Sequence, residues 1–372
     1  MLIAAATAVV LAGCGGAPDS QPGQGNEIVV GAVWSLTGHA ALYGTPQKNA
    51  ADLAVEEINA SGRFGGRTIR LVTEDDRSTQ EGAIAAVDKL TSRDRVVAIL
   101  GPTLSNSAKA ADPIAQERRV VVLAVSNTAD GIVEIGDYVF RNSLPERVVQ
   151  PNTIRTTLSA LRYKRVAVLY GDDDAFTKSG YDVFERALDE AGIEVISTQT
   201  FQKNDNDLLP QLTRIKSAAP DAIVVSALGE EAALIMTQAR QLGMTMPIIG
   251  GNGFNSPKLV ELAGRAAEGA ISGAAWFIGN ERPENQKFVP AYRARYGIDP
   301  DQFAAQAYAG VYLLAEAIMR ANETTPAAIR DALASLRGVS TVLGEFSFDE
   351  QRNPVHDPVV QMVRDGRFEL FR

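Results

Sequence analysis

Two polar loops carry the residue types best suited to hold a small anion. Residues 103–107 (TLSNS) follow the apolar run 96–100, and residues 126–128 (SNT) follow the apolar run 120–125. Hydroxyl groups and free main-chain N–H groups at the start of a helix can converge on one carboxylate or phosphate. Plain helix capping is the alternative for either loop alone, but the repeated arrangement favours a ligand cradle. The predicted contact residues of this cradle are Ser105, Ser126, Asn127 and Thr128.

The apolar runs before these loops are short and rich in β-branched residues, as expected of strands buried in a parallel sheet. Similar strands alternate with amphipathic helices in two series, over residues 28–125 and 166–250. This repeated βαβ pattern predicts an α/β fold of two doubly wound domains. Parallel strands present their carboxyl ends at one edge of the sheet, where such domains usually bind ligands.

Several helix starts are predicted from local signals. Pro46 is expected at the first position of a helix, where its missing N–H costs nothing. Ser78 and Glu81 have the spacing of a capping box, which predicts the start of the next helix. In the second series, residues 179–191 have the pattern of an amphipathic helix.

Past residue 269 the regular alternation ends. Three helices follow, and residues 342–348 are expected to pair with residues 359–364 as terminal strands. These elements are too few for a third domain, so the chain must cross between the two domains more than once, which makes a hinge. The predicted lobe 1 comprises residues 27–145 plus 276–345, and the predicted lobe 2 comprises residues 146–275 plus 346–372.

The only cysteine, Cys14, follows Leu11-Ala12-Gly13 at the end of an uncharged apolar run that begins at Met1. This arrangement resembles a bacterial lipoprotein signal peptide, after which the cysteine becomes the lipid-modified N-terminus. A buried helix is the alternative, but the glycines around Cys14 disfavour it. We therefore predict a signal peptide over residues 1–14, lipid attachment at Cys14 and a flexible tether over residues 15–26.

The composition excludes several classes of partner and chemistry. A formal charge of -9 without a Lys/Arg cluster disfavours nucleic acid as a partner. The two histidines, His39 and His356, lack metal-ligand spacing, and the sequence contains neither a nucleophile elbow nor a phosphate loop. The acidic residues 74–76 and 172–174 are interpreted as solvated loops, with a metal site as the alternative. We therefore predict no catalytic residue, no metal and no cofactor.

Seven short segments occur along the chain in a distinctive order. They are 38–44 with Tyr43, 52–62 (DLAVEEINASG), Gly101-Pro102 with Ser105, 126–128, 250–253, 306–314 (QAYAGVYLL) and 344–349. In this order they resemble the solute-binding proteins of ABC importers for branched-chain amino acids, which have the type I periplasmic-binding-protein fold. The resemblance runs from Ile28 to Phe368 and implies two lobes, joined by a multi-strand hinge, that close on a ligand between them.

The resemblance also implies roles for individual residues. The α-carboxylate of the ligand would be held by Ser105, Ser126 and Thr128, in agreement with the cradle inferred above. Tyr43 would pack against the ligand. An aromatic residue after the first strand of lobe 2 would cover the ligand, and Phe176 is the candidate, with Ala175 as the alternative match.

One position departs from the family pattern. Family members that bind amino acids have an acidic residue in the loop corresponding to residues 250–253, where it pairs with the ligand's ammonium, but this chain has Asn252. A buried ammonium without a carboxylate partner is costly. A second family position, normally aromatic, is Leu228. Amides, urea-like compounds and uncharged carboxylic acids therefore compete with α-amino acids as ligands, unless Glu230 or Glu231 reaches the cleft.

The resemblance implies an extracytoplasmic, lipid-anchored solute-binding protein and not an enzyme. It would capture a small polar solute, a branched-chain amino acid or a related compound, and deliver it to the transmembrane subunits of an ABC permease. The protein is expected to be a monomer, held at the outer face of the cell membrane only by its N-terminal lipid; if the cell is Gram-negative, this location is the periplasm. The alternative is a sensory module that reports amides, urea or small carboxylates to a receptor or regulator.

Overall fold

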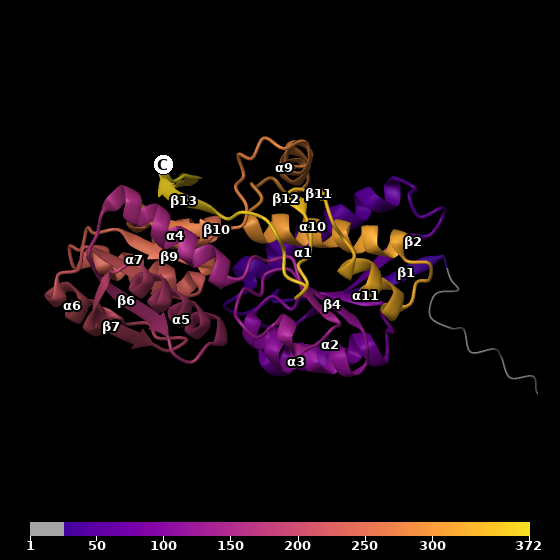
Figure 1. Ribbon diagram of the computed structural model, residues 1–372, viewed down its shortest axis with the longest axis horizontal. Coiled ribbons are helices and arrows are strands. Elements are labelled where there is room, and N and C mark those ends of the chain that lie inside the picture. The colour runs from indigo at the N-terminus through magenta and orange to yellow at the C-terminus, as the bar shows by residue number, and fades with distance from the viewer. Residues whose placement is uncertain (1–25) are drawn as a thin grey trace, which may run out of the picture.

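The computed structural model describes residues 26–372, so the predicted signal peptide, Cys14 and residues 15–25 of the predicted tether lie outside the described residues. The described chain forms two α/β lobes side by side (Figure 1). Lobe 1 is built on a five-stranded sheet and lobe 2 on a seven-stranded sheet. Helices cover both faces of each sheet, which confirms the predicted doubly wound architecture.

All strands of the five-stranded lobe 1 sheet are parallel, in the order β2-β1-β3-β4-β5. They are β1 (Glu27–Trp34), β2 (Thr68–Asp75), β3 (Ala98–Leu100), β4 (Val121–Ala124) and β5 (Val139–Arg141). One face is covered by α2 (Gln80–Ser92) and α3 (Ser105–Glu117). The other face is covered by α1 (Ala41–Ala60), α9 (Pro283–Tyr296), α10 (Gln302–Arg320) and α11 (Pro326–Ala334). Helices from the end of the chain thus complete the first lobe, with α10 lying along α1 (Figure 1).

The sheet of lobe 2 has the order β14-β13-β10-β9-β8-β6-β7, in which β13 and β14 are antiparallel to their neighbours. Its strands are β6 (Arg165–Gly171), β7 (Glu194–Phe201), β8 (Ala222–Ser226), β9 (Ile248–Gly250), β10 (Ile271–Ala274), β13 (Val359–Arg364) and β14 (Arg367–Leu370). One face is covered by α4 (Glu146–Leu161) and α5 (Ala175–Glu190). The other is covered by α6 (Leu209–Ala218), α7 (Gly229–Gln241) and α8 (Pro257–Ala263).

The chain passes between the lobes at three places, from β5 to α4, from β10 to α9, and from the small hairpin of β11 (Val339–Thr341) and β12 (Gly344–Phe346) to β13. Arg141 ties two of these crossovers together. Its side chain is completely buried, and its Nε donates to Oδ1 of Asn353 over 2.7 Å. Three crossovers make a hinge of several strands, as the sequence analysis predicts.

Three predicted helix starts are wrong because contacts with other segments shift them. Helix α1 begins at Ala41, so Pro46 lies inside it. Gly44 packs closely on Ser35: a Cβ added at Gly44 would lie 2.1 Å from the main-chain oxygen of Ser35. This close contact holds the first turn of α1 in place. Helix α2 is capped by Thr79, whose hydroxyl accepts from Gly82 N, because Ser78 instead donates to Thr37 O. Helix α5 begins at residue 175, where Asp174 accepts from two main-chain N–H groups.

The predicted pairing of residues 342–348 with 359–364 is also wrong. β12 pairs with β11, whereas β13 pairs with β10 and β14. The register places Val360 opposite Gly273, so that the apolar side chains of β13 extend the buried surface of the lobe 2 sheet. A partner seventy or more residues away in sequence therefore outcompetes the near one.

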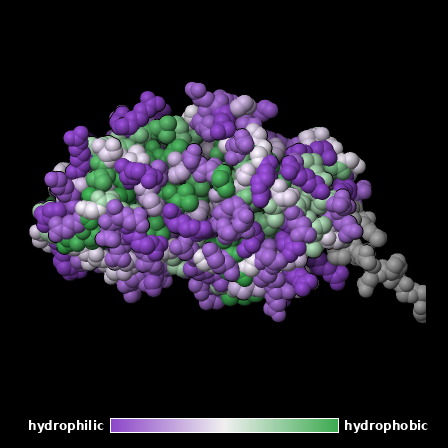
Figure 2. Space-filling model, in the orientation of Figure 1, coloured by the Kyte–Doolittle hydropathy of each residue, from purple (hydrophilic) through white to green (hydrophobic). Residues whose placement is uncertain are grey.

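No helix within residues 26–372 combines the length and the apolar character needed to cross a bilayer. Hydrophilic residues predominate on the face seen in Figure 2, and the apolar ones gather mainly over lobe 2.

Candidate ligand-binding site

A small cavity of about 20 Å³ lies between the lobes, where the carboxyl ends of both sheets meet. Lobe 1 lines it with Tyr43, Thr103, Leu104, Ser105, Ser126 and Phe303, and lobe 2 lines it with Phe176, Leu228, Asn252 and Gly253. The structure therefore brings together five of the residues predicted from the sequence. A cavity of this volume holds about one water molecule, so the lobes are closed on one another in this conformation.

Ser105 is the first residue of α3, as the sequence analysis predicts. The residue before it, Leu104, has no side-chain oxygen with which to cap the helix. The main-chain N–H groups of the first turn therefore stay available to a ligand, beside the Ser105 hydroxyl. The positive end of the helix dipole at this point favours a negatively charged group such as a carboxylate.

Ser126 lines the cavity but is already fully bonded within lobe 1. Its hydroxyl donates to Thr103 O over 2.6 Å and accepts from Gln47 Nε2 over 2.8 Å. The Thr103 hydroxyl in turn donates to Gln47 Oε1 and accepts from Ser35 N. The two predicted loops are thus fastened to each other by a buried network, which fixes the positions of both relative to α3.

Asn127 and Thr128 are buried but do not line the cavity. The amide of Asn127 donates to Thr103 O, and its main-chain oxygen accepts from Ser143, so it ties the loop to the hinge. Thr128 differs, because its Oγ1 has no hydrogen-bond partner among the described residues although the side chain is only 2% exposed. Its main-chain oxygen accepts from the N–H of Glu146, over 3.0 Å, at the start of lobe 2.

Three aromatic side chains form the apolar part of the wall. The rings of Tyr43 and Phe303 lie with their centroids 4.5 Å apart, and Phe176 faces them from lobe 2. The sequence analysis missed Phe303, whose only signal is an aromatic residue at a helix start, just before the segment 306–314. Ala175 does not line this cavity; its N–H donates to Asn106 Oδ1 across the lobes.

Burial raises the pKa of the Tyr43 hydroxyl well above its usual range, and the nearby charge of Glu231 raises it further. Glu231 is buried but does not line the cavity, and Glu230 is exposed. Neither acidic residue of α7 therefore replaces the missing acid directly at the wall.

Asn252 lies at the cavity with its amide orientation determined by its neighbours. Gln302 Oε1 accepts from the main-chain N–H of Ala275, so the Gln302 Nε2 group must be the donor on the other side. That Nε2 donates to Asn252 Oδ1 over 2.6 Å. The acceptor of Asn252 is thus engaged, and only its NH₂ group remains for a ligand.

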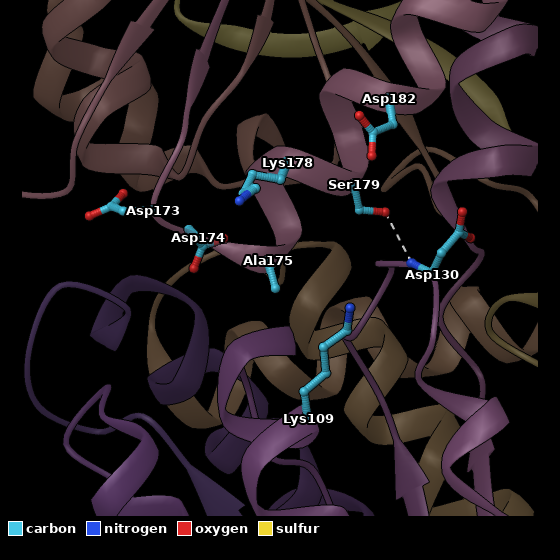
Figure 3. A pocket seen from close by; sticks show the side chains of 8 residues that line it. All are labelled: Lys109, Asp130, Asp173, Asp174, Ala175, Lys178, Ser179 and Asp182. Carbon is cyan, nitrogen blue, oxygen red and sulfur yellow. Dashed lines mark hydrogen bonds between the residues drawn. The ribbon is translucent and has the colours of Figure 1, made fainter.

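A larger, more open cavity of about 390 Å³ lies farther out between α3 and α5 (Figure 3). It is lined by Lys109, Asp130, Asp173, Asp174, Ala175, Lys178, Ser179 and Asp182. A hydrogen bond from Asp130 N to Ser179 Oγ, 3.0 Å long, joins the lobes at its edge (Figure 3). Its walls are charged and hold no aromatic side chain, so we assign ligand binding to the smaller cavity.

The acidic residues considered as metal ligands are used within the fold. Asp76 is buried, contrary to the solvated loop predicted, and accepts from the Ser35 hydroxyl over 2.7 Å. Asp174 caps α5. Within residues 26–372 no group of three or more His, Cys, Asp or Glu side chains has the geometry to hold a metal ion.

Comparisons with known proteins agree with this arrangement. Residues 27–367 match the family model described as periplasmic binding protein. The chain is 28% identical over 353 residues to Leu/Ile/Val-binding protein homolog 2 of Brucella abortus, which covers 93% of this chain and 94% of that protein. It is 26% identical over 317 residues to the leucine-, isoleucine-, valine-, threonine-, and alanine-binding protein of Pseudomonas aeruginosa, with coverages of 85% and 84%.

Among solved structures, the substrate-binding protein LivJ of a branched-chain amino acid transporter from Streptococcus pneumoniae, in complex with isoleucine, is similar with a TM-score of 0.87. The two chains are 30% identical, and the match covers 92% of this chain and 97% of that one. The chain therefore belongs to the periplasmic binding protein family, among the substrate-binding proteins of branched-chain amino acid ABC transporters, and is a solute-binding protein and not an enzyme.

Proposed function

We propose that this chain captures a small α-amino acid of the branched-chain type between its lobes and passes it to its ABC permease. The observation that carries the proposal is the interlobe cavity, where the uncapped start of α3 and Ser105 lie beside the rings of Tyr43, Phe176 and Phe303. An anion site next to an apolar wall suits a carboxylate with a hydrocarbon side chain. The names of the relatives, which specify leucine, isoleucine and valine, support the same class.

In this proposal the ligand enters when the two lobes rotate apart about the three crossovers. Lobe 1 comprises residues 27–145 plus 276–345, and lobe 2 comprises residues 146–275 plus 346–372. The cavity of about 20 Å³ in this conformation has to widen to hold an amino acid, so the lobes open before the ligand binds and then close around it. A ligand that touches both lobes favours the closed state, because only a difference in affinity between the two states can shift their populations.

We further propose that the mature protein is a monomer anchored through a lipid on Cys14. The sequence before Asn26 supports this with an apolar run, a cysteine and a Gly/Pro-rich stretch. A tether of this length has a coil reach of about 20 Å, which keeps the lobes close to the outer face of the membrane and its permease.

Asn252 supports a second class of ligand. With its Oδ1 engaged by Gln302, its NH₂ group donates to a ligand oxygen, which an amide, a urea or a second carboxylate offers. A protein with such a ligand would serve equally as the sensory module of a receptor or regulator.

The test is thermal unfolding of the purified protein against branched-chain, aromatic and acidic amino acids, short amides, urea and small carboxylates. A ligand at about 100 times its Kd stabilises the folded state by about 2.7 kcal/mol, which raises the unfolding midpoint. A rise with leucine, isoleucine or valine supports the first proposal. A rise only with amides, urea or simple carboxylates replaces it with the second.

A further inference from the structure

A closed group of unpartnered polar atoms lies just behind the lobe 2 wall of the cavity. At its centre is Glu146, the first residue of α4, whose side chain is 1% exposed. Its Oε1 accepts from Gln150 Nε2 over 2.8 Å, but its Oε2 has no hydrogen-bond partner among the described residues. Three neighbouring atoms within residues 26–372 also lack partners, namely Gln150 Oε1, Ser226 Oγ and Thr128 Oγ1. We call these four residues the acceptor cluster.

The surroundings of two glycines, Gly180 and Gly251, show that the acceptor cluster lies next to the ligand cavity. A Cβ on Gly180 would lie 2.2 Å from Ser226 Oγ and 2.9 Å from Glu146 Oε1. A Cβ on Gly251 would lie 3.1 Å from Gln150 Nε2 and 3.8 Å from Glu146 Oε1. Gly251 directly precedes Asn252, which lines the cavity. The cluster is therefore one residue layer from Asn252, the position at which the family resemblance implies an acidic residue, and only glycine leaves its interior open.

The chemistry of the acceptor cluster calls for a donor with several N–H groups. A carboxylate oxygen and an amide oxygen can only accept, and each hydroxyl can accept as well. The buried cation Arg141 makes no ion pair with Glu146: its Nε and Nη1 donate to Asn353 Oδ1 and to main-chain oxygens of Asn127 and Ala129, and its Nη2 has no partner among the described residues. A buried carboxylate oxygen without a donor, such as Glu146 Oε2, is costly, so a primary ammonium is the group that would satisfy the cluster.

The electrostatic environment of Glu146 also favours a positively charged ligand group at the acceptor cluster. Burial raises the pKa of the Glu146 carboxyl well above its usual range, and the charges of Asp130 and Asp174 raise it further, while a hydrogen bond with Ser179 and the charge of Arg141 act in the opposite direction. The surroundings of Glu146 therefore carry excess negative charge, which a ligand cation would offset.

We propose that Glu146 supplies the carboxylate missing at Asn252, so that the ligand's ammonium lies against the acceptor cluster while its carboxylate lies at the start of α3. This inference rests on the proposed function, since it specifies that the ligand is a zwitterionic α-amino acid. Glu146 also donates its N–H to Thr128 O of lobe 1, so the ammonium binds beside a contact that both lobes share.

Glu231 is the matched comparison within the same chain. It is also a buried acid in the first turn of a helix, and its Oε2 also lacks a partner among the described residues. It differs in position: a Cβ on Gly251, next to Asn252, would lie 3.8 Å from Glu146 Oε1, whereas no atom of Glu231 is among the three atoms nearest that Cβ. We therefore expect Glu231 to have no part in holding the ammonium.

The experiment measures the affinities of leucine and of 4-methylpentanoate, which is leucine without its amino group. Glu146→Gln keeps the size of the side chain and removes its charge; it should weaken leucine binding by at least about 100-fold and leave 4-methylpentanoate binding unchanged. Glu231→Gln should change neither. Gly251→Ala, which places a methyl group against Gln150, should also weaken leucine more than 4-methylpentanoate, and it tests the inference if Glu146→Gln does not fold.

Unchanged leucine affinity in Glu146→Gln, or a loss in Glu231→Gln in its place, would overturn the inference and leave the proposed function standing. Equal losses for leucine and 4-methylpentanoate would also overturn it, since they indicate a structural role. If no amino acid binds the unaltered protein, the proposed function fails and the inference fails with it.

Discussion

The hydroxyl of Tyr43, on lobe 1, donates to the main-chain oxygen of Gly253, on lobe 2, over 2.9 Å. The same hydroxyl accepts from the N–H of Gly229 over 2.6 Å. The ring of Tyr43 also lines the cavity between the lobes. One side chain therefore joins the closed lobes to each other and forms part of the surface that a ligand contacts.

Tyr43→Phe should weaken ligand binding about tenfold, because it keeps the ring but removes one hydrogen-bond donor and acceptor from the closed state. The change should appear in the Kd measured by calorimetry. Tyr170→Phe is the control, since Tyr170 stacks on Tyr181 within lobe 2, away from the cavity. Equal affinities for Tyr43→Phe and the unaltered protein would show that the two bonds do not contribute to closure.

Thr128→Val should lower ligand affinity about tenfold without lowering the unfolding midpoint of the ligand-free protein. The reason is that Thr128 Oγ1 is buried without a partner among the described residues, so the folded chain loses no bond with it. Affinity and thermal unfolding are measured on the same preparation. A drop in the midpoint with unchanged affinity would show that the hydroxyl serves the fold alone.

Ser105→Ala should weaken ligand binding by about 1 to 3 kcal/mol, since the hydroxyl at the start of α3 is proposed to donate to the ligand's carboxylate. Ser107→Ala is the matched control on the same helix. Ser107 is buried, does not line the cavity, and its hydroxyl faces Thr79 O. The Ser105 role would be refuted by equal ligand affinities in the two variants.

Asp301→Asn should remove part of the pH dependence of stability. Burial raises the pKa of Asp301 from 3.8 to about 7, so the folded chain holds a proton that the unfolded chain releases in this range. The stability that this group contributes is present below about pH 4 and is lost as the pH rises through about 7. Asparagine caps α10 as well as aspartate does and does not titrate.

The measurement for Asp301 is urea unfolding of both proteins at pH 5 and pH 7.5. The unaltered protein should lose more stability than Asp301→Asn between these two values. Parallel pH profiles would show that the carboxyl of Asp301 titrates normally.

Cys14→Ser should release the protein from the membrane fraction, because the proposed anchor is a lipid on the Cys14 sulfur. Labelling of growing cells with a radioactive fatty acid should mark the unaltered protein and not the variant. The ligand affinity of the released protein should be unchanged. Labelling of Cys14→Ser would place the lipid elsewhere.

Local patterns in the sequence were sufficient for the strands and for part of the site. The β-branched runs predict β1, β3, β4, β6 and β8, and the Ser105 loop is predicted to begin a helix where α3 begins. Both results depend on short-range physics, namely the burial of continuous β-branched runs in a parallel sheet and the preference of short polar loops for helix starts. The same reasoning placed Asn127 in the site, where the structure instead turns its amide toward Thr103.

The remaining features depend on segments that lie far apart in the chain. Phe303 and Gln302 reach the cavity from α10, which packs on lobe 1 only after the chain has built and left lobe 2. The engaged acceptor of Asn252 and the unpartnered oxygen of Glu146 follow from the closed arrangement of the two lobes. The sequence by itself determined the two-lobed α/β fold and the start of α3 at Ser105, because these arise from local apolar periodicity and short polar loops. Only the tertiary structure decided which acceptors remain free for a ligand, because hydrogen bonding depends on distances of a few ångströms between distant residues.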